Sequence, residues 1–284
     1  VLSIDFNPLN MQEMYVTVSS ENGGIGNIYR FTDKNNPASM TTIPAPPGTQ
    51  NRPGHLKVLN DGTLMCYYTC RDIGTSGPVY VYAPSSGVFY TSNSGVNWSG
   101  NNLTGMTYDV RSVTIDRNDN SQNTWWACIG KNGSGGVPGL YKTTNRGNSW
   151  TLIINNKNTI SCTFHPLLAN VMYLSTQDEG LFYCTNTNNV PALTLVSSYP
   201  FKFPQEVFFN PYNVDEVWVT SFGNGLKKGY TNLVSGINNQ NTKFNNELIV
   251  FPNPANDLVN IKRENQTVLN VKIYSTLGKL VKEY

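Results

Sequence analysis

TSNSGVNW at residues 91–98 and TTNRGNSW at residues 143–150 are two copies of one short pattern, and CTNTNN at residues 184–189 is a degenerate third copy. In each full copy an asparagine stands two residues before a glycine, and a tryptophan follows three residues later: Asn93, Gly95 and Trp98, then Asn145, Gly147 and Trp150. The asparagine can accept hydrogen bonds from turn amides, the glycine tolerates a positive φ, and the tryptophan can bury its ring beside the next strand. The pattern therefore predicts a recurring β-hairpin.

A second repeat is an apolar strand that ends in a polar or Asn-Pro corner and is followed by another apolar strand. The corners lie 45 to 57 residues apart, at Asn7, Asn60, Arg117, His165 and Asn210. The strands that follow them are rich in aromatic and β-branched residues: MYVTV, LMCYYT, TWWACIG, VMYLST and VWVTS. Repeats of roughly this length with four short strands are typical of propeller blades. We predict an all-β fold, a β-propeller of four-stranded blades, with about five blades visible.

The first residues and the composition of the chain lead to further predictions about upstream segments, partners and membrane spans. The chain opens inside a predicted strand, VLSIDF, so we expect more blades and a targeting segment upstream, with seven blades in the parent protein. A net charge of +2 without a basic run argues against a nucleic-acid partner. No apolar stretch reaches the roughly 18 to 20 residues that a transmembrane segment needs, so none is predicted.

Metal sites and disulfides are not expected either. The loop at residues 116–123 has spaced oxygen ligands but lacks the central glycine and closing glutamate of a calcium loop, so a solvated turn is favoured. His55 and His165 form no ligand pattern, and a structural role is favoured for His165. The cysteines lack CxxC-like spacing and are predicted to be buried free thiols: Cys66, Cys70, Cys128, Cys162 and Cys184. We therefore predict no cofactor and no metal.

The C-terminal part has a different character. An Asn-rich polar linker at residues 233–247 separates the blades at 1–232 from a module at 248–284, where DLVNIK, LNVKIYS and STLGKLV predict strands and a hairpin of a small β-sandwich. FPNPANDLVNI at 251–261 and VKIYSTLGKLVKE at 271–283 resemble the C-terminal sorting domain of the type IX secretion system of Bacteroidetes. That family normally continues through further strands, so the resemblance implies a truncated domain in this sequence. The resemblance implies type IX secretion machinery as a partner and export across the outer membrane, to the cell surface or the medium. Another small β-sandwich appended to a propeller is the alternative.

The repeated unit resembles the Asp-box hairpins of sialidase-like propellers, sortilin-type propellers and family seventy-four glycoside hydrolases, which degrade xyloglucan. The last resemblance covers roughly residues 1–233, where DGTLMCYYTC, GLYKTTNRGNSWTLI and EVFFNPYNVDEVWVTSFGNG follow the family's order. It implies a polysaccharide partner outside the cell. The family's two catalytic aspartates lie in its opening blade and in a second propeller, both beyond the matched region, whereas glycoside hydrolysis needs both carboxylates. No catalytic residue is therefore assigned, and whether the protein is an enzyme stays open.

Three clusters of aromatic and polar residues are candidates for a ligand-binding face. They are Tyr67, Tyr68, Arg71 and Asp72, where a strand enters the Gly-rich loop RDIGTSGP; Tyr108, Asp109 and Arg111, where the strand nearest the channel opens; and Trp125 and Trp126 on a central strand. Adjacent side chains on a strand point to opposite faces, so we expect one tryptophan to be exposed while the other packs between blades. Alternatively the aromatic residues form core, and Asp109 pairs with Arg111. Two functions remain: binding or processing of polysaccharide, and a non-catalytic scaffold or adhesin for proteins or cells.

Overall fold

The computed structural model of the chain describes residues 1–19, 25–49, 51–69, 72–76, 79–82, 87–101, 109–131, 137–188, 190–231, 248–251, 260–263, 272–274 and 280–283. The chain forms two compact units, Val1–Asn232 and Leu233–Tyr284. In the described part of the chain, no helix has the length and apolar character that crossing a membrane requires.

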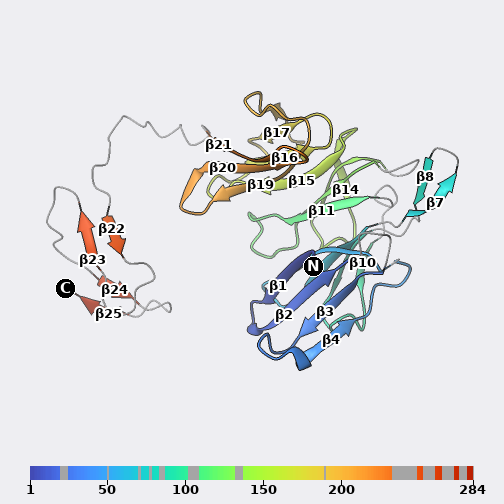
Figure 1. The fold of residues 1–284 in the computed structure, drawn as a ribbon, viewed down its shortest axis with the longest axis horizontal. Coiled ribbons are helices and arrows are strands. Elements are labelled where there is room, and N and C mark those ends of the chain that lie inside the picture. The colour runs from blue at the N-terminus through green and yellow to red at the C-terminus, as the bar shows by residue number, and fades with distance from the viewer. Residues whose placement is uncertain are drawn as a thin grey trace. The chain divides into compact units, whose positions relative to one another are not determined.

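The first unit is built from antiparallel sheets that follow one another along the chain (Figure 1). Blades 1 and 2 are β1 (Ser3–Asn7), β2 (Asn10–Val18), β3 (Asn27–Phe31) and β4 (Met40–Ile43), then β5 (Pro53–Val58), β6 (Leu64–Tyr68), β9 (Gly87–Thr91) and β10 (Ser99–Asn101). Blades 3 and 4 are β11 (Val110–Ile115), β12 (Trp125–Ile129), β13 (Gly139–Thr143) and β14 (Thr151–Asn155), then β15 (Thr159–Phe164), β16 (Met172–Thr176), β17 (Leu181–Cys184) and β18 (Thr194–Leu195). Blade 5 has three strands within the described residues, β19 (Pro204–Asn210), β20 (Asn213–Ser221) and β21 (Gly225–Tyr230). A short 3₁₀ helix, η1 (Pro37–Ser39), precedes β4. The all-β propeller prediction is confirmed.

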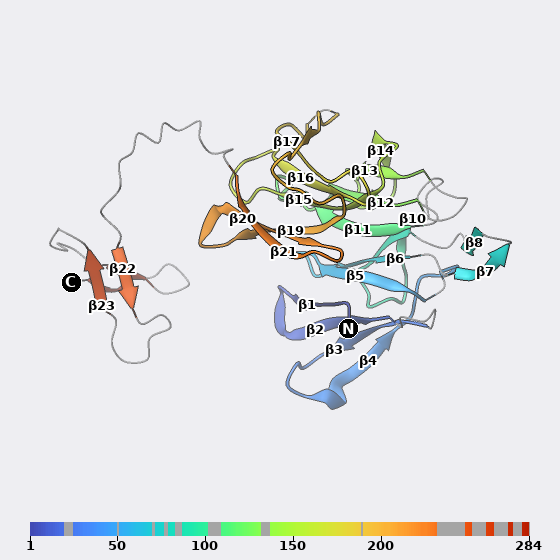
Figure 2. The ribbon, with the colours of Figure 1, turned by 45° about the horizontal axis from the view of Figure 1, so that its top comes forward.

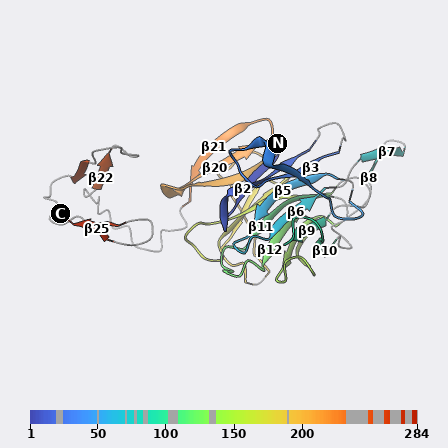
Figure 3. The ribbon, with the colours of Figure 1, turned by 90° about the horizontal axis from the view of Figure 1, so that it is seen from below.

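The first strand of each blade lies next to the first strand of the following blade (Figure 2). The view from below in Figure 3 shows β5 beside β11. Side chains join these strands, since neighbouring blades share no backbone ladder. Ser3 Oγ accepts the backbone N–H of Leu56 at 2.9 Å, between blades 1 and 2. Ser112 Oγ donates to the carbonyl of Ile160 at 2.9 Å, between blades 3 and 4. The first strands therefore form a hydrogen-bonded centre.

The apolar core is divided into three clusters, each shared by consecutive blades. Adjacent residues on a central strand fall into different clusters because their side chains point to opposite faces. Tyr68 packs with blade 1 residues such as Tyr15, while Tyr67 packs with blade 3 residues such as Trp125. Trp126 packs with blade 4 residues in the third cluster. Blades 2 and 3 therefore each contribute one face to a cluster with the preceding blade and the other face to a cluster with the following blade.

The hairpins of blades 2 and 3 share one geometry. Asn93 Oδ1 accepts the backbone N–H of Asn97 at 2.9 Å, and Asn145 Oδ1 accepts that of Ser149 at 2.9 Å. Gly95 and Gly147 both have φ of +82°, the left-handed conformation that glycine adopts without a Cβ clash. The tryptophans differ in their surroundings: Trp98 Nε1 donates to the Pro44 carbonyl at 2.8 Å, whereas Trp150 Nε1 is buried without a partner among the described residues.

The corners between first and second strands are closed by a side chain that accepts the backbone N–H two residues later. Asn7, His165 and Asn210 do so at 3.0, 3.1 and 2.9 Å. In blades 2 and 3 the accepting side chains are Asp61 and Asp116, at 3.0 and 2.9 Å. These lie one residue from Asn60 and Arg117, the corner positions inferred from the sequence. The corners therefore lie where the sequence placed them, and the accepting residue is the neighbouring aspartate, since a carboxylate accepts a local N–H group whereas arginine has no acceptor.

Two further segments complete the fold. The predicted Gly-rich loop after β6 is instead a hairpin of β7 (Asp72–Ser76) and β8 (Val79–Tyr82), inserted before β9. Glycine and small residues permit such a two-stranded ribbon as readily as a loop. In the second unit β22 (Leu248–Phe251) pairs with β23 (Asn260–Arg263), and β24 (Lys272–Tyr274) pairs with β25 (Leu280–Glu283). The four described cysteines, Cys66, Cys128, Cys162 and Cys184, are buried free thiols, as predicted, and Cys70 lies outside the described residues.

Candidate functional site

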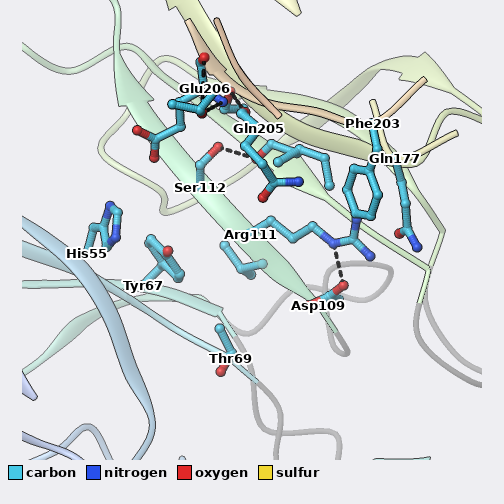
Figure 4. Close-up of a pocket in the computed structure, with 14 residues that line it drawn as sticks. His55, Tyr67, Thr69, Asp109, Arg111, Ser112, Gln177, Phe203, Gln205 and Glu206 are labelled. Atoms are coloured by element: carbon cyan, nitrogen blue, oxygen red, sulfur yellow. Dashed lines mark hydrogen bonds and ion pairs between the residues drawn. The ribbon is translucent and has the colours of Figure 1, made fainter. Parts of the chain in front are cut away.

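A cavity of about 490 Å³ lies among the first strands of blades 2 to 5 (Figure 4). Blade 2 contributes His55 on β5 and Tyr67 on β6, while blade 3 contributes the start of β11 from Asp109 to Ser112. Blades 4 and 5 contribute Ile160, Ser161, Gln177, Phe203, Gln205, Glu206 and Thr220. The cavity therefore combines ionic, amide, hydroxyl and aromatic groups from segments far apart in sequence.

An ion pair stands at one end of this cavity. Arg111 Nε donates to Asp109 Oδ2 at 2.6 Å, and the two side chains are 16% and 12% exposed. They share a face of the strand because the fully buried Val110 between them points the other way. Burial raises the pKa of Asp109, while the positive charges of Arg111 and Arg52 act in the opposite direction. The carboxylate is thus held beside a cation in a partly desolvated place.

Two glycines leave room for the side chains that line the cavity. A Cβ on Gly130 would lie 2.0 Å from Arg111 Nε and 2.2 Å from its guanidinium carbon. A Cβ on Gly54 would lie 2.0 and 2.2 Å from ring atoms of Tyr67. Real Cβ atoms do not approach other atoms so closely. The Arg111 guanidinium therefore packs directly on the backbone at Gly130, and the Tyr67 ring packs on the backbone at Gly54. A larger residue at either position would clash with the side chain that packs there.

Tyr67 forms the aromatic wall on the blade 2 side. Its side chain is 6% exposed, and its ring centroid lies 6.2 Å from that of His55. Burial raises the pKa of the Tyr67 phenol, and the negative charges of Glu206 and Asp109 raise it further. The hydroxyl consequently stays protonated at neutral pH and can donate a hydrogen bond.

Two polar side-chain atoms around the cavity have no partner among the described residues. Gln177 Oε1 and Gln205 Nε2 are buried and make no hydrogen bond among the described residues. Buried polar groups of folded proteins are nearly always paired, so an acceptor and a donor left over at one cavity require an explanation. A polar ligand with hydroxyl groups would satisfy both, since a hydroxyl donates as well as accepts.

The structure brings together part of the predicted binding face. Tyr67, Asp109 and Arg111 line the cavity, and Asp109 pairs with Arg111 as the alternative interpretation proposed. Tyr68 is instead core, at 1% exposure. Trp125 and Trp126 point to opposite faces, but both are 0% exposed because each packs against a neighbouring blade, so the expectation of one exposed tryptophan was wrong. Arg71, Tyr108 and the side chain of Asp72 lie outside the described residues.

Sequence reasoning missed the contribution of blades 4 and 5. Ile160 and Gln205 stand five residues before the corner residues His165 and Asn210, as Arg111 stands five before Asp116. In blades 3 to 5 the corner repeat therefore carried a signal, because the residue five positions before the corner lines the cavity, whereas Leu56, five positions before Asp61 in blade 2, belongs to the core. Gln177 follows β16 and has no equivalent signal.

The loop at residues 116–123 is organised by its own backbone. Asp116 Oδ2 accepts Trp126 Nε1 at 2.9 Å, while Asp119 Oδ2 accepts the backbone N–H groups of Asn123 and Thr124 at 3.0 and 2.8 Å. Hydrogen bonds from Ser121 and Thr124 lower the pKa of Asp119 to about 2. Within the described residues no three His, Cys, Asp or Glu side chains gather as a metal site would need.

Comparison with solved structures agrees with the propeller. The GH74 enzyme of Niastella koreensis is similar with a TM-score of 0.54 and 16% identity, over 81% of this chain and 38% of that one. PorZ, a surface component of the type IX secretion system of Porphyromonas gingivalis, is similar with a TM-score of 0.53 and 15% identity, over 99% and 38%. YCF48 from Cyanidioschyzon merolae is similar with a TM-score of 0.51 and 15% identity, over 82% and 84%. This chain thus spans less than two thirds of the first two proteins. At these identities the likeness shows the fold alone.

Comparison with family models identifies the C-terminal module. Residues 249–284 match the secretion system C-terminal sorting domain, as the sequence resemblance implied. The protein is therefore exported, with attachment to the cell surface or release, and its C-terminal domain implies contact with the secretion machinery. A comparison with curated protein sequences found no significant match.

Proposed function

We propose that this exported β-propeller binds extracellular polysaccharide in the cavity formed by the first strands of blades 2 to 5. The observation that carries the proposal is the pair of unpartnered buried amide atoms, Gln177 Oε1 and Gln205 Nε2. Aromatic side chains at the same cavity, Tyr67 and Phe203, supply the apolar surface against which a sugar ring packs. The fold likeness to a GH74 enzyme supports the proposal without carrying it.

Binding is favoured over hydrolysis on the described residues. Asp109 is engaged by Arg111, and Glu206 is the other carboxylate at the cavity. A glycoside hydrolase needs one carboxyl group that donates a proton and a second that acts as base or nucleophile. Because Arg111 Nε already occupies Asp109 Oδ2 at 2.6 Å, the described residues supply no second unengaged carboxylate beside Glu206 for these two roles.

A non-catalytic scaffold is the second candidate, and blade 5 supports it. Phe208, Trp218 and Tyr230 are 44%, 38% and 63% exposed. Phe208 and Trp218 are opposite each other on β19 and β20, on the face turned away from the core residues Val207 and Val219. Exposed aromatic surface of this kind marks protein interaction sites.

Polymer retention with simultaneous assay of new reducing ends separates these functions. The full chain is run through gels containing neutral and acidic polysaccharides, and its retardation is compared with that of Gln177→Ala and Gln205→Ala. Gln12→Ala, which removes an exposed amide on β2, is the matched control. We expect retention without new reducing ends, weakened in the two cavity variants and unchanged in the control. New reducing ends would establish a hydrolase, and no retention on any polymer would favour the scaffold.

A further inference from the structure

We propose that the polysaccharide bound in this cavity is a uronic-acid polymer, and that Arg111 binds its carboxylate through Nη1 and Nη2. The inference deepens the proposed function and rests on it, because it names the chemical class of the ligand at the same site.

The first observation is that the Arg111 guanidinium has N–H donors without a hydrogen-bond partner among the described residues. Arginine carries five N–H donors, and the described hydrogen bond of Arg111 uses one of them, from Nε to Asp109 Oδ2 at 2.6 Å. Its terminal nitrogens Nη1 and Nη2 have no hydrogen-bond partner in the part of the chain that the structure describes, and the side chain is 16% exposed. A guanidinium withdrawn from water in this way leaves four donors for a ligand.

The second observation is that the guanidinium is held in place. Asp109 fixes Nε from one side, and the missing Cβ of Gly130 lets the planar group lie on backbone, since a Cβ there would be 2.4 Å from one terminal nitrogen. Because Nε is occupied, the outer edge that carries Nη1 and Nη2 is the edge left for a ligand. Two parallel N–H donors at fixed spacing match the two oxygens of a carboxylate.

The surroundings of Arg111 also suit a carboxylate. Phe203 and Gln177 lie at the guanidinium end of the cavity, whereas the Glu206 carboxylate points away from that end (Figure 4). Gln205 Nε2 adds a second unpaired donor. The arrangement places an acidic group of the sugar at Arg111 and hydroxyl groups at the amides, while Glu206 disfavours acidic groups at the far end.

The test compares polymers that differ in the carboxyl group alone. Affinity electrophoresis of the full chain uses polygalacturonate and alginate, their carboxyl-reduced counterparts, and neutral xyloglucan. We expect polyuronates to bind about tenfold or more tighter than the reduced polymers, as for a charge-assisted hydrogen-bonded pair. Arg111→Lys keeps the charge but loses the fork, and we expect it to abolish most of this preference. Arg117→Lys, two residues beyond the other end of β11, is the matched control and should leave the preference intact.

Two outcomes distinguish failure of the uronic-acid inference from failure of the proposed polysaccharide binding. Equal binding of polyuronates and reduced polymers would overturn the inference while leaving the proposed function standing, whereas no binding of any polymer would overturn the proposed function itself. Should Arg111→Lys unfold, Gly130→Ala displaces the guanidinium without removing it and should erase the preference equally. An undiminished preference in folded Arg111→Lys or in Gly130→Ala would exclude Arg111 as the carboxylate-binding residue.

Discussion

The corners of the blades and the central cavity use the same kinds of polar side chain in opposite ways. At the corners Asn7, Asp116 and Asn210 each accept a backbone N–H two residues later, so their polar atoms are satisfied within the turn. At the cavity Gln177 and Gln205 retain buried atoms without partners. β11 joins both regions, with Asp116 just beyond one end and Arg111 near the other. The polar groups of these three corners serve the fold, whereas the two unpartnered amide atoms at the cavity are the ones that we propose a ligand satisfies.

Removal of a corner acceptor tests most directly whether the corner side chains stabilise the fold. Asp116→Ala leaves the indole N–H of the fully buried Trp126 and the Asn118 backbone N–H without their acceptor. We expect it to lower the free energy of unfolding by about 3 kcal/mol, the upper range for stranded buried donors. Urea denaturation measures this, with exposed Asp178→Ala as the control. A folded variant retains polymer binding, and a loss under about 1 kcal/mol would show that the corner is not stabilised as described.

The two glycines at the cavity distinguish rigid from movable neighbours. Gly54→Ala forces a methyl group against the buried ring of Tyr67, and we expect a loss of about 2 kcal/mol. Gly130→Ala meets the end of a flexible arginine, so we expect a loss under about 1 kcal/mol, because the side chain can swing aside. Gly229→Ala, whose Cβ would lie 3.9 Å from its nearest neighbour, is the control. Equal losses for both cavity variants would contradict the packing described.

His165 allows the corner to be tested by pH. Its Nδ1 accepts the N–H groups of Leu167 and Leu168, each at 3.1 Å, and burial lowers its pKa. The neutral ring therefore stabilises the fold fully above the ordinary histidine pKa near 6.5, and this contribution is lost as pH falls through the lowered pKa of the folded state.

His165→Asn copies the acceptor found at Asn7 and Asn210 without a titrating group. We expect similar thermal stability at pH 8 and a shallower loss of stability below about pH 6.5 than in the native protein. Melting temperatures between pH 5 and 8 provide the measurement, with His55→Asn on the exposed part of β5 as control. Parallel pH profiles for His165→Asn and the native protein would show that His165 is not the acid-sensitive group.

The smallest expected effect on stability is that of a substitution at the cavity. Gln177→Met removes the unpaired buried Oε1 while keeping the length of the side chain. Because no hydrogen bond is lost, we expect stability to be unchanged or raised by up to about 1 kcal/mol, with weaker polymer retention. Chemical denaturation and gel retardation on one preparation check both. A clear destabilisation would mean that the amide serves the fold and not a ligand.

The sequence was sufficient for the fold because its repeats are local. Asn93, Gly95, Asn145 and Gly147 make hairpin turns within a few residues, and the corners act over two or three residues. The cavity depends on segments that meet from different blades, so the grouping of Tyr67 with Glu206 is not encoded in any short pattern. The prediction that Trp125 or Trp126 is exposed failed for the same reason. Their burial depends on neighbouring blades, which the sequence of a single strand does not reveal.

The division of the core into clusters shared by consecutive blades has a kinetic consequence. Each cluster joins segments close in the chain, so assembly proceeds through nearest-neighbour contacts without waiting for the two ends to meet. The folding chain can therefore add one blade at a time to those already formed. Hydrogen exchange should correspondingly be slowest in β12, whose tryptophans belong to two clusters, and fastest in blade 5.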